Sequence, residues 1–276
     1  IAAEQLPCVF HVSARTVSTQ SLNIFGDHSD VMACRQTGFA MLCEGNVQEV
    51  MDLSPVAHLA ALSGKVPFIN FFDGFRTSHE IQKIAVWDYD DLKDMCDMDA
   101  VAEFRRHALN PEHPHMRGSH ENGDIFFQHR EACNKYYTEL PAVVEQYMDK
   151  INAKLGTDYK LFNYYGAPDA DRVIIAMGSI CDVAEEVIDY LNAHGEKVGL
   201  VKVRLFRPFA AEKLIEALPA SVQKIAVLDR TKEPGSQGEP LYQDVVTALA
   251  NAGWNDIKVI GGRYGLGSKD TPPASV

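Results

Sequence analysis

One arginine, Arg15, stands where a short apolar run gives way to a polar loop. Residues 8–12 (CVFHV) are a short run rich in β-forming residues, which is typical of a buried strand, and loops that follow strands carry binding groups. A guanidinium at such a position can hold a carboxylate through paired hydrogen bonds. A surface arginine or an ion-paired arginine fits the same pattern, so spacing alone leaves these interpretations open.

Three further polar residues, Asp27, His28 and Asp30, follow Gly26 on the same loop. Aspartate side chains accept hydrogen bonds from nearby backbone N–H groups and thereby order turns. The interpretation favoured for this group is therefore a hydrogen-bonded loop that orders the region around Arg15.

Other possible sites are weaker. Two glycine–serine turns, residues 178–179 and 235–238, precede predicted helices, where backbone N–H groups could bind phosphate. The GxGxxG fingerprint of dinucleotide sites is absent, and an architectural role is favoured for both turns. Five histidines could suggest a metal site, but their irregular spacing argues against one: His107, His113, His115, His120 and His129.

The composition excludes several classes of protein. The chain has 276 residues and a formal net charge of −12, whereas a nucleic-acid-binding protein usually presents a basic face. No apolar run approaches the roughly 18 residues that a membrane span needs. Ile1 is followed by no basic and apolar leader, so we expect no signal peptide, and a segment of a longer protein is consistent with this start. The six cysteines form no CxxC pair, which predicts no iron–sulfur or zinc site and a reduced, cytoplasmic protein.

The first half of the chain alternates apolar runs with amphipathic stretches, which predicts a parallel sheet covered by helices. The predicted strands are residues 8–12, 31–34 and 67–73, and the predicted helices are residues 48–63, 87–109 and 141–155. FAML is a short apolar patch between two glycines. Residues 110–128 are predicted to be irregular, so that 85–141 forms an excursion. The polar stretch 157–168 is predicted to connect two domains.

The second half is more regular and predicts a βαβαβαβ unit. Its predicted strands are residues 172–177, 198–203, 224–228 and 257–260, and its predicted helices are residues 182–193, 210–218 and 241–252. The sequence therefore predicts an α/β protein with two mostly parallel, three-layer domains, residues 1–156 and residues 169–276.

Long stretches of the chain resemble pyruvate:ferredoxin (or flavodoxin) oxidoreductases. They are HVSAR, SLNIFGDHSDVMACRQTGFAML, VQEVMDL, FFDGFRTSHEIQKI, NPEHPHMRGSHENGDIFFQ and the tail YGLGSK. Matches of this length are more specific than any short motif. The resemblance implies an internal piece of a large enzyme: the C-terminal part of a thiamine pyrimidine-type domain, and then a domain similar to the transketolase C-terminal domain.

The resemblance also implies an activity. The family oxidises pyruvate to acetyl-CoA and carbon dioxide with thiamine diphosphate, Mg²⁺ and [4Fe–4S] clusters, and passes the electrons to ferredoxin or flavodoxin. Carried over by motif, Arg15 in HVSAR holds the substrate carboxylate, and Ile24 in SLNIFGDH lies against the cofactor. The family's activating glutamate, magnesium site and clusters lie elsewhere in its chain. No catalytic or metal residue is therefore expected here, and the chain alone is expected to bind no cofactor and to be inactive.

The partners that the resemblance implies are pyruvate, coenzyme A, ferredoxin or flavodoxin, the other domains of the enzyme and a second copy in a homodimer. Two alternatives remain open from the sequence. One is an α-type subunit of a related 2-oxoacid:ferredoxin oxidoreductase with a changed substrate pocket. The other is a non-catalytic module that docks neighbouring domains.

Overall fold

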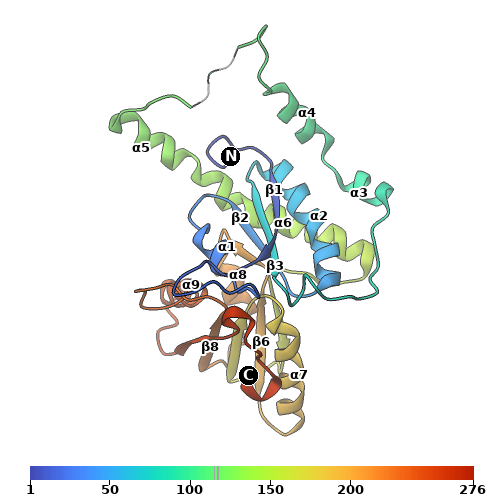
Figure 1. Cartoon of the computed structure of the whole chain (residues 1–276), viewed down its shortest axis with the longest axis vertical. Helices are drawn as coiled ribbons and strands as arrows, with labels where there is room; N and C mark the ends of the chain where they lie inside the picture. The colour runs from blue at the N-terminus through green and yellow to red at the C-terminus, as the bar shows by residue number, and fades with distance from the viewer. Residues whose placement is uncertain (115, 117) are drawn as a thin grey trace.

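The computed structural model describes residues 1–114, 116 and 118–276, and its strands form two sheets that lie one above the other in Figure 1. The first sheet has the strand order β1-β3-β2-β7. Its strands are β1 (Val9–Ala14), β2 (Ala40–Glu44), β3 (Phe68–Asp73) and β7 (Leu205–Arg207). Strands β1 and β2 run parallel to β3, and the short β7 runs antiparallel to β2.

The second sheet has the strand order β4-β6-β5-β8-β9. Its strands are β4 (Phe162–Gly166), β5 (Arg172–Ala176), β6 (Val198–Val203), β8 (Lys224–Asp229) and β9 (Lys258–Arg263). All neighbouring pairs are parallel except β4 with β6. The predicted fold class, α/β with mostly parallel sheets, is confirmed.

Helices cover these sheets because their apolar residues recur on one face. The helices of the body are α1 (Ser29–Ala33), α2 (Val47–Gly64), α6 (Asn134–Leu155), α7 (Ile180–Ala193), α8 (Ala211–Ala217) and α9 (Pro240–Asn251). Two 3₁₀ turns, Leu266–Ser268 and Pro273–Ser275, lie near the C-terminus. No described helix is both long and apolar enough to cross a membrane.

An arm leaves the body between β3 and α6 (Figure 1). It carries α3 (Tyr89–Met95), α4 (Met98–Arg106) and α5 (Gly123–Ala132), and α4 and α5 bury none of their described residues. The predicted excursion is therefore present, but it is more helical than expected. Residues 123–128 were predicted to be irregular but belong to α5. Helix α6 begins before Pro141 rather than at it, because burial of the adjacent Leu140 favours the helix despite the proline.

Two other predictions of secondary structure are wrong, and strand β2 was not predicted. Residues 31–34 are not a strand, since α1 covers most of them; a short apolar run fits either element, and the side chain of Asp27 turns the backbone at Ser29. The patch FAML contributes to β2, whose residues are all buried. The stretch 157–168 is not a plain connection, because it contains the edge strand β4.

The division into domains at 1–156 and 169–276 stays a prediction. Strand β7 comes from the second half of the chain but pairs with the first sheet, whereas β4 precedes residue 169 but pairs within the second sheet.

We predict that a segment of residues 157–276 is more stable in isolation than a segment of residues 169–276. The longer segment keeps β4, and with it the buried side chains of Leu161 and Phe162. Burying two such side chains contributes about 3 kcal/mol or more to the free energy of unfolding. Urea unfolding followed by circular dichroism measures the difference, and equal free energies would show that β4 is dispensable.

Candidate anion-binding site at the carboxyl edge of the first sheet

The site lies where the parallel strands β1 and β3 end side by side. Ala14 pairs in register with Asp73, so the residues that follow them, Arg15 and Gly74, meet at the carboxyl edge of the sheet, where α/β proteins bind ligands. Position 74 requires glycine because a Cβ there would lie 2.1 Å from the carbonyl oxygen of Ala14.

The backbone of Arg15 is fixed by the loop that follows it. The N–H of Arg15 donates to Asp30 Oδ2 (2.9 Å), and the Arg15 carbonyl accepts from the N–H of Asp30 (3.2 Å). Gly26 closes the loop with a φ of +98°, which favours glycine. The predicted role of Asp30 in a hydrogen-bonded loop around Arg15 is confirmed.

The guanidinium of Arg15 has no acidic partner among the described residues. Its Nη1 atom is buried without a hydrogen-bond acceptor, and its Cζ lies 4.6 Å from the ring centroid of Phe75. The ion-paired interpretation of Arg15 is therefore wrong for the part of the chain that the structure covers. Anion binding by Arg15 stays a prediction, since Nη1 has no acceptor within this chain but is buried.

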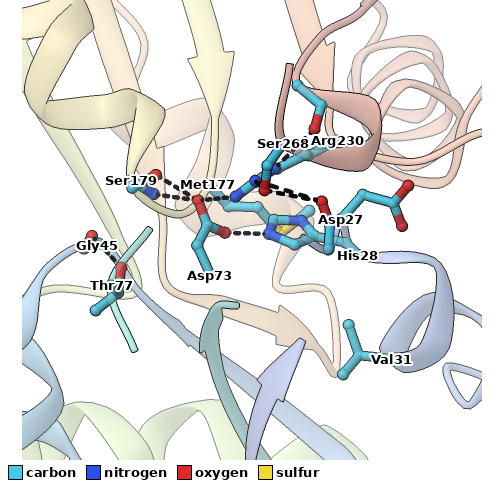
Figure 2. A network of polar contacts seen from close by, with 12 residues as sticks. Asp27, His28, Val31, Gly45, Asp73, Thr77, Met177, Ser179, Arg230 and Ser268 are labelled. Carbon is cyan, nitrogen blue, oxygen red and sulfur yellow. Dashed lines mark hydrogen bonds and ion pairs between the residues drawn. The ribbon is translucent and has the colours of Figure 1, made fainter. Parts of the chain in front are cut away.

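A buried network beside Arg15 joins the two sheets (Figure 2). His28 Nε2 donates to Asp73 Oδ1 at 2.5 Å, and Arg230 Nη1 lies 2.5 Å from Asp73 Oδ2. The N–H of Ser179 donates to the same Oδ2 at 3.1 Å, and the Ser179 hydroxyl also donates to it. The three charged or ionisable side chains are at most 3% exposed, so their pairing is required to offset loss of water.

The ionisation of Asp73 follows from these contacts. Burial alone raises the pKa of a carboxyl, but the charges of His28 and Arg230 and the bond from Ser179 together hold the pKa of Asp73 well below its usual range. Asp73 is therefore a carboxylate at every pH at which the protein would normally be studied.

At both turns that could have bound phosphate, backbone N–H groups already donate to carboxylates of this chain. The N–H of Ser179, at the start of α7, donates to Asp73 rather than being free for a ligand. At the start of α9, the N–H groups of Leu241 and Tyr242 donate to Asp229 at 2.9 and 3.1 Å. A carboxylate near a helix N-terminus meets the positive end of the helix dipole, so both turns support the architectural interpretation.

A second ion pair crosses between the sheets. Arg204, which lies between β6 and β7, is 2.6 Å from Glu49 Oε1 at the start of α2, and the two side chains are 4% and 12% exposed. The side chain of Glu49 also accepts from the N–H of Gly45, directly after β2. The two halves of the chain are thus joined by a buried ion pair here as well as at Asp73.

Ile24, the residue assigned to the cofactor, lies on the Arg15 loop and is 66% exposed. Its neighbour Phe25 is 50% exposed and contacts Phe75 edge-on, with ring centroids 5.0 Å apart. The structure places Ile24 close to Arg15 along the chain but gives it no contact that tests its role, so that assignment stays a prediction.

The histidine-rich stretch lies on the arm. His115 is outside the described residues, and the residues that are described contain no group of three or more potential ligands that could hold a metal ion. His129 Nδ1 lies 2.6 Å from Glu121, which is an ordinary exposed contact. The absence of a metal site here stays a prediction.

Sequence reasoning missed two contributors to this site. It placed Asp73 at the end of a strand without assigning it a role, and it did not single out Arg230. An aspartate followed by glycine at a strand end, and the Asp-Arg pair that ends VLDR, were the available signals.

The fold and the site together define a class. The chain is an α/β protein with a cationic loop at the carboxyl edge of parallel strands, the place where proteins of this class bind their ligands. Comparison with known families is more specific. Residues 1–149 match the model described as pyruvate flavodoxin/ferredoxin oxidoreductase, thiamine diphosphate-binding, and residues 170–276 match pyruvate:ferredoxin oxidoreductase core domain II. The chain belongs to the pyruvate flavodoxin/ferredoxin oxidoreductase family.

Individual relatives agree with this assignment. The chain is 63% identical over 276 residues to pyruvate:ferredoxin oxidoreductase from Moorella thermoacetica, and it covers 24% of that protein. It is 61% identical over 276 residues to pyruvate-flavodoxin oxidoreductase from Enterobacter agglomerans, of which it covers 23%. The chain thus spans about a quarter of the length of these relatives, and each match includes all of this chain.

A solved structure shares the fold. It is 2-oxoglutarate:ferredoxin oxidoreductase from Magnetococcus marinus with 2-oxoglutarate, coenzyme A and succinyl-CoA bound. The TM-score is 0.63 at 19% identity, over 99% of this chain and 48% of that one. At this identity the likeness shows the fold alone.

We predict that Asp73→Asn strongly destabilises the chain. The change keeps the shape but leaves Arg230 as a buried cation without a carboxylate, and breaking a buried pair in this way costs about 3–5 kcal/mol. Chemical denaturation should show a loss of this size. Asp171→Asn, at an exposed ion pair with Arg172, is the control and should cost less than about 1 kcal/mol. Equal effects of the two changes would contradict the role given to Asp73.

We also predict a pH effect from Asp229. Burial raises the pKa of this carboxyl to about 6, above its usual value of 3.8. The folded state binds this proton more tightly than the unfolded state, so protonation of Asp229 stabilises the fold. This contribution is complete below about pH 4 and is lost as the pH rises through 6. The loss is about 3 kcal/mol at 1.36 kcal/mol per pKa unit. Unfolding free energies at pH 4 to 7 test this prediction, and Asp229→Asn should remove this part of the slope; an unchanged slope would contradict it.

Proposed function

We propose that this chain is part of an enzyme that oxidatively decarboxylates pyruvate to acetyl-CoA and carbon dioxide, and that it supplies the side of the site that binds the substrate carboxylate. The observation that carries the proposal is the unpartnered guanidinium of Arg15 at the carboxyl edge of the sheet. A carboxylate is the natural acceptor for its planar fork of N–H donors. The names of the relatives favour pyruvate over another 2-oxoacid as substrate.

Residues of this chain also suit one side of a thiamine diphosphate site. Ile24 and Phe25 present exposed apolar surface on the Arg15 loop, which is suited to contact an aromatic or bent organic group. When bound, thiamine diphosphate supplies a nucleophilic carbon and a sink for the electron pair that decarboxylation releases. The chain's own part is to hold and orient the substrate carboxylate and to form a wall beside the cofactor.

Mg²⁺ and [4Fe–4S] clusters are proposed to lie in other parts of the parent enzyme. No described group of histidine, cysteine or acidic side chains here fits a metal ion, and no reaction step is assigned to one in this chain. Ferredoxin or flavodoxin as electron acceptor, and coenzyme A as acyl acceptor, are proposed from the relatives' names and from the coenzyme A bound in the structural neighbour.

The organisation proposed for the chain is a thiamine-type domain, residues 1–156, and a second domain, residues 169–276. Support comes from the two matched regions, which end at residue 149 and begin at residue 170. On this proposal the isolated chain is inactive, and it works in contact with the other domains of a homodimeric parent. The six cysteines are all free, which suits the reducing cytoplasm.

Replacement of Arg15 in the full-length enzyme tests the proposed function. Hydrogen bonds to charged groups contribute about 1.5–3 kcal/mol, so Arg15→Ala should lower kcat/KM for pyruvate about 10- to 150-fold. Arg15→Lys should recover only part of this loss, because it keeps the charge without the fork. Steady-state kinetics with pyruvate as the varied substrate provide the measurement.

Thiamine diphosphate content and unfolding midpoint should be measured for the same variants. Arg172→Ala is the control, since Arg172 is exposed on β5 and its ion partners, Asp171 and Glu196, also lie in the second half of the chain. If Arg15→Ala lost cofactor while the KM for pyruvate stayed constant, the substrate role of Arg15 would be wrong.

A further inference from the structure

The residue that follows Gly74 has an unusual backbone. Phe75 has a φ of +64°, in the left-handed region that non-glycine residues rarely adopt, and a bulky aromatic side chain makes it more unfavourable still. Its N–H donates to the hydroxyl of Ser78 at 2.9 Å, and that hydroxyl lies 2.8 Å from His79 Nδ1. A short turn thus holds Phe75 in a conformation that local preferences oppose, and this kind of strain concentrates at functional sites.

The ring of Phe75 is fixed on more than one side. The ring of His79 stacks on it with a centroid separation of 4.2 Å and an interplanar angle of 3°, and the ring of Phe25 meets it edge-on at 5.0 Å. The Cζ of Arg15 lies 4.6 Å from its centroid. Two aromatic neighbours therefore hold the ring against the cation.

The contact with the ring of Phe75 restrains a guanidinium that has no ionic partner among the described residues. A carboxylate partner would hold the guanidinium still but would occupy the donors that a substrate needs. An aromatic face attracts the cation without taking up a carboxylate-binding donor, and Nη1 of Arg15 indeed has no acceptor. The ring can therefore reduce the motion of the guanidinium without forming a hydrogen bond with any of its N–H donors.

We propose that Phe75 is a positioning residue that orients the guanidinium of Arg15 for a substrate carboxylate, and that its strained backbone is retained because it brings the ring against Arg15. This proposal rests on the proposed function of Arg15. Phe75 acts through Arg15 rather than on the reacting atoms, so its removal should weaken substrate binding and leave the chemical step intact.

The first test uses the full-length enzyme with Phe75→Leu and Phe75→Tyr. A cation–π contact of ordinary strength corresponds to a rise in the KM for pyruvate of about 2- to 30-fold in Phe75→Leu, with kcat within about twofold of the starting enzyme. Phe75→Tyr keeps the ring and should restore most of the affinity. Phe209→Leu is the matched control, because Phe209 is also partly exposed and also contacts aromatic rings, but it lines a pocket that does not include Arg15.

A fall in kcat together with lost cofactor in Phe75→Leu, not restored in Phe75→Tyr, would overturn the proposal and indicate a purely structural role. A KM equal to that of Phe209→Leu would also overturn it.

The second test separates Phe75 from Arg15. In an Arg15→Ala background, Phe75→Leu should have no further effect on kcat/KM, since the group it positions has been removed. The same fold loss in both backgrounds would overturn the positioning role while leaving the role of Arg15 intact. If Arg15→Ala alone left kcat/KM unchanged, the proposed function of Arg15 would fail, and the positioning role would fail with it.

The third test addresses the backbone. Phe75→Gly and Phe75→Ala both remove the ring, but only glycine accepts the left-handed conformation without cost. Both variants should raise the KM for pyruvate equally, while Phe75→Gly should have the higher Tm. Phe75→Gly also serves for the kinetic tests if Phe75→Leu fails to fold. A Tm for Phe75→Ala equal to or above that of Phe75→Gly would show that no strain is retained at this position.

Discussion

The carboxylate of Asp73 is the interaction on which the arrangement of the site depends. A buried charge needs compensation, and Asp73 takes it from His28 on the Arg15 loop, Arg230 after β8 and Ser179 at α7. These partners come from both halves of the chain. Asp73 is in register with Ala14, which directly precedes Arg15. The contacts that join the sheets at Asp73 therefore also help to fix the backbone position of Arg15.

The charges around this edge are arranged so that Arg15 remains unneutralised in a chain of net charge −12. Asp73 is matched by cations, and Asp229 accepts from the backbone of α9. Glu44 is fully buried in β2, and this burial raises the pKa of its carboxyl well above the usual range. The carboxylates of Asp73, Asp229 and Asp30 thus have partners other than the guanidinium of Arg15.

The sequence was informative where structure is local and repetitive. Residues 67–73 and 48–63 were predicted nearly as they occur, because a continuous apolar run marks a buried strand and apolar residues recurring on one face mark a helix. The three-residue β7 is too short to leave one. The prediction of a strand at residues 31–34 failed because tertiary context decides the structure of a four-residue apolar run. Arg15 could be found from its position at a strand end, but the pairing of Asp73 with Arg230 joins residues far apart in the chain and leaves no local signal.

The transition from β6 to β7 restricts how the molecule can move. Strand β6 ends at Val203 in the second sheet and β7 begins at Leu205 in the first, so a single residue, Arg204, carries the chain across. A connection this short has no slack, and its side chain is anchored to Glu49. A large change in the relative position of the two sheets would therefore have to break the pairing of β7 with β2 or the ion pair of Arg204 with Glu49.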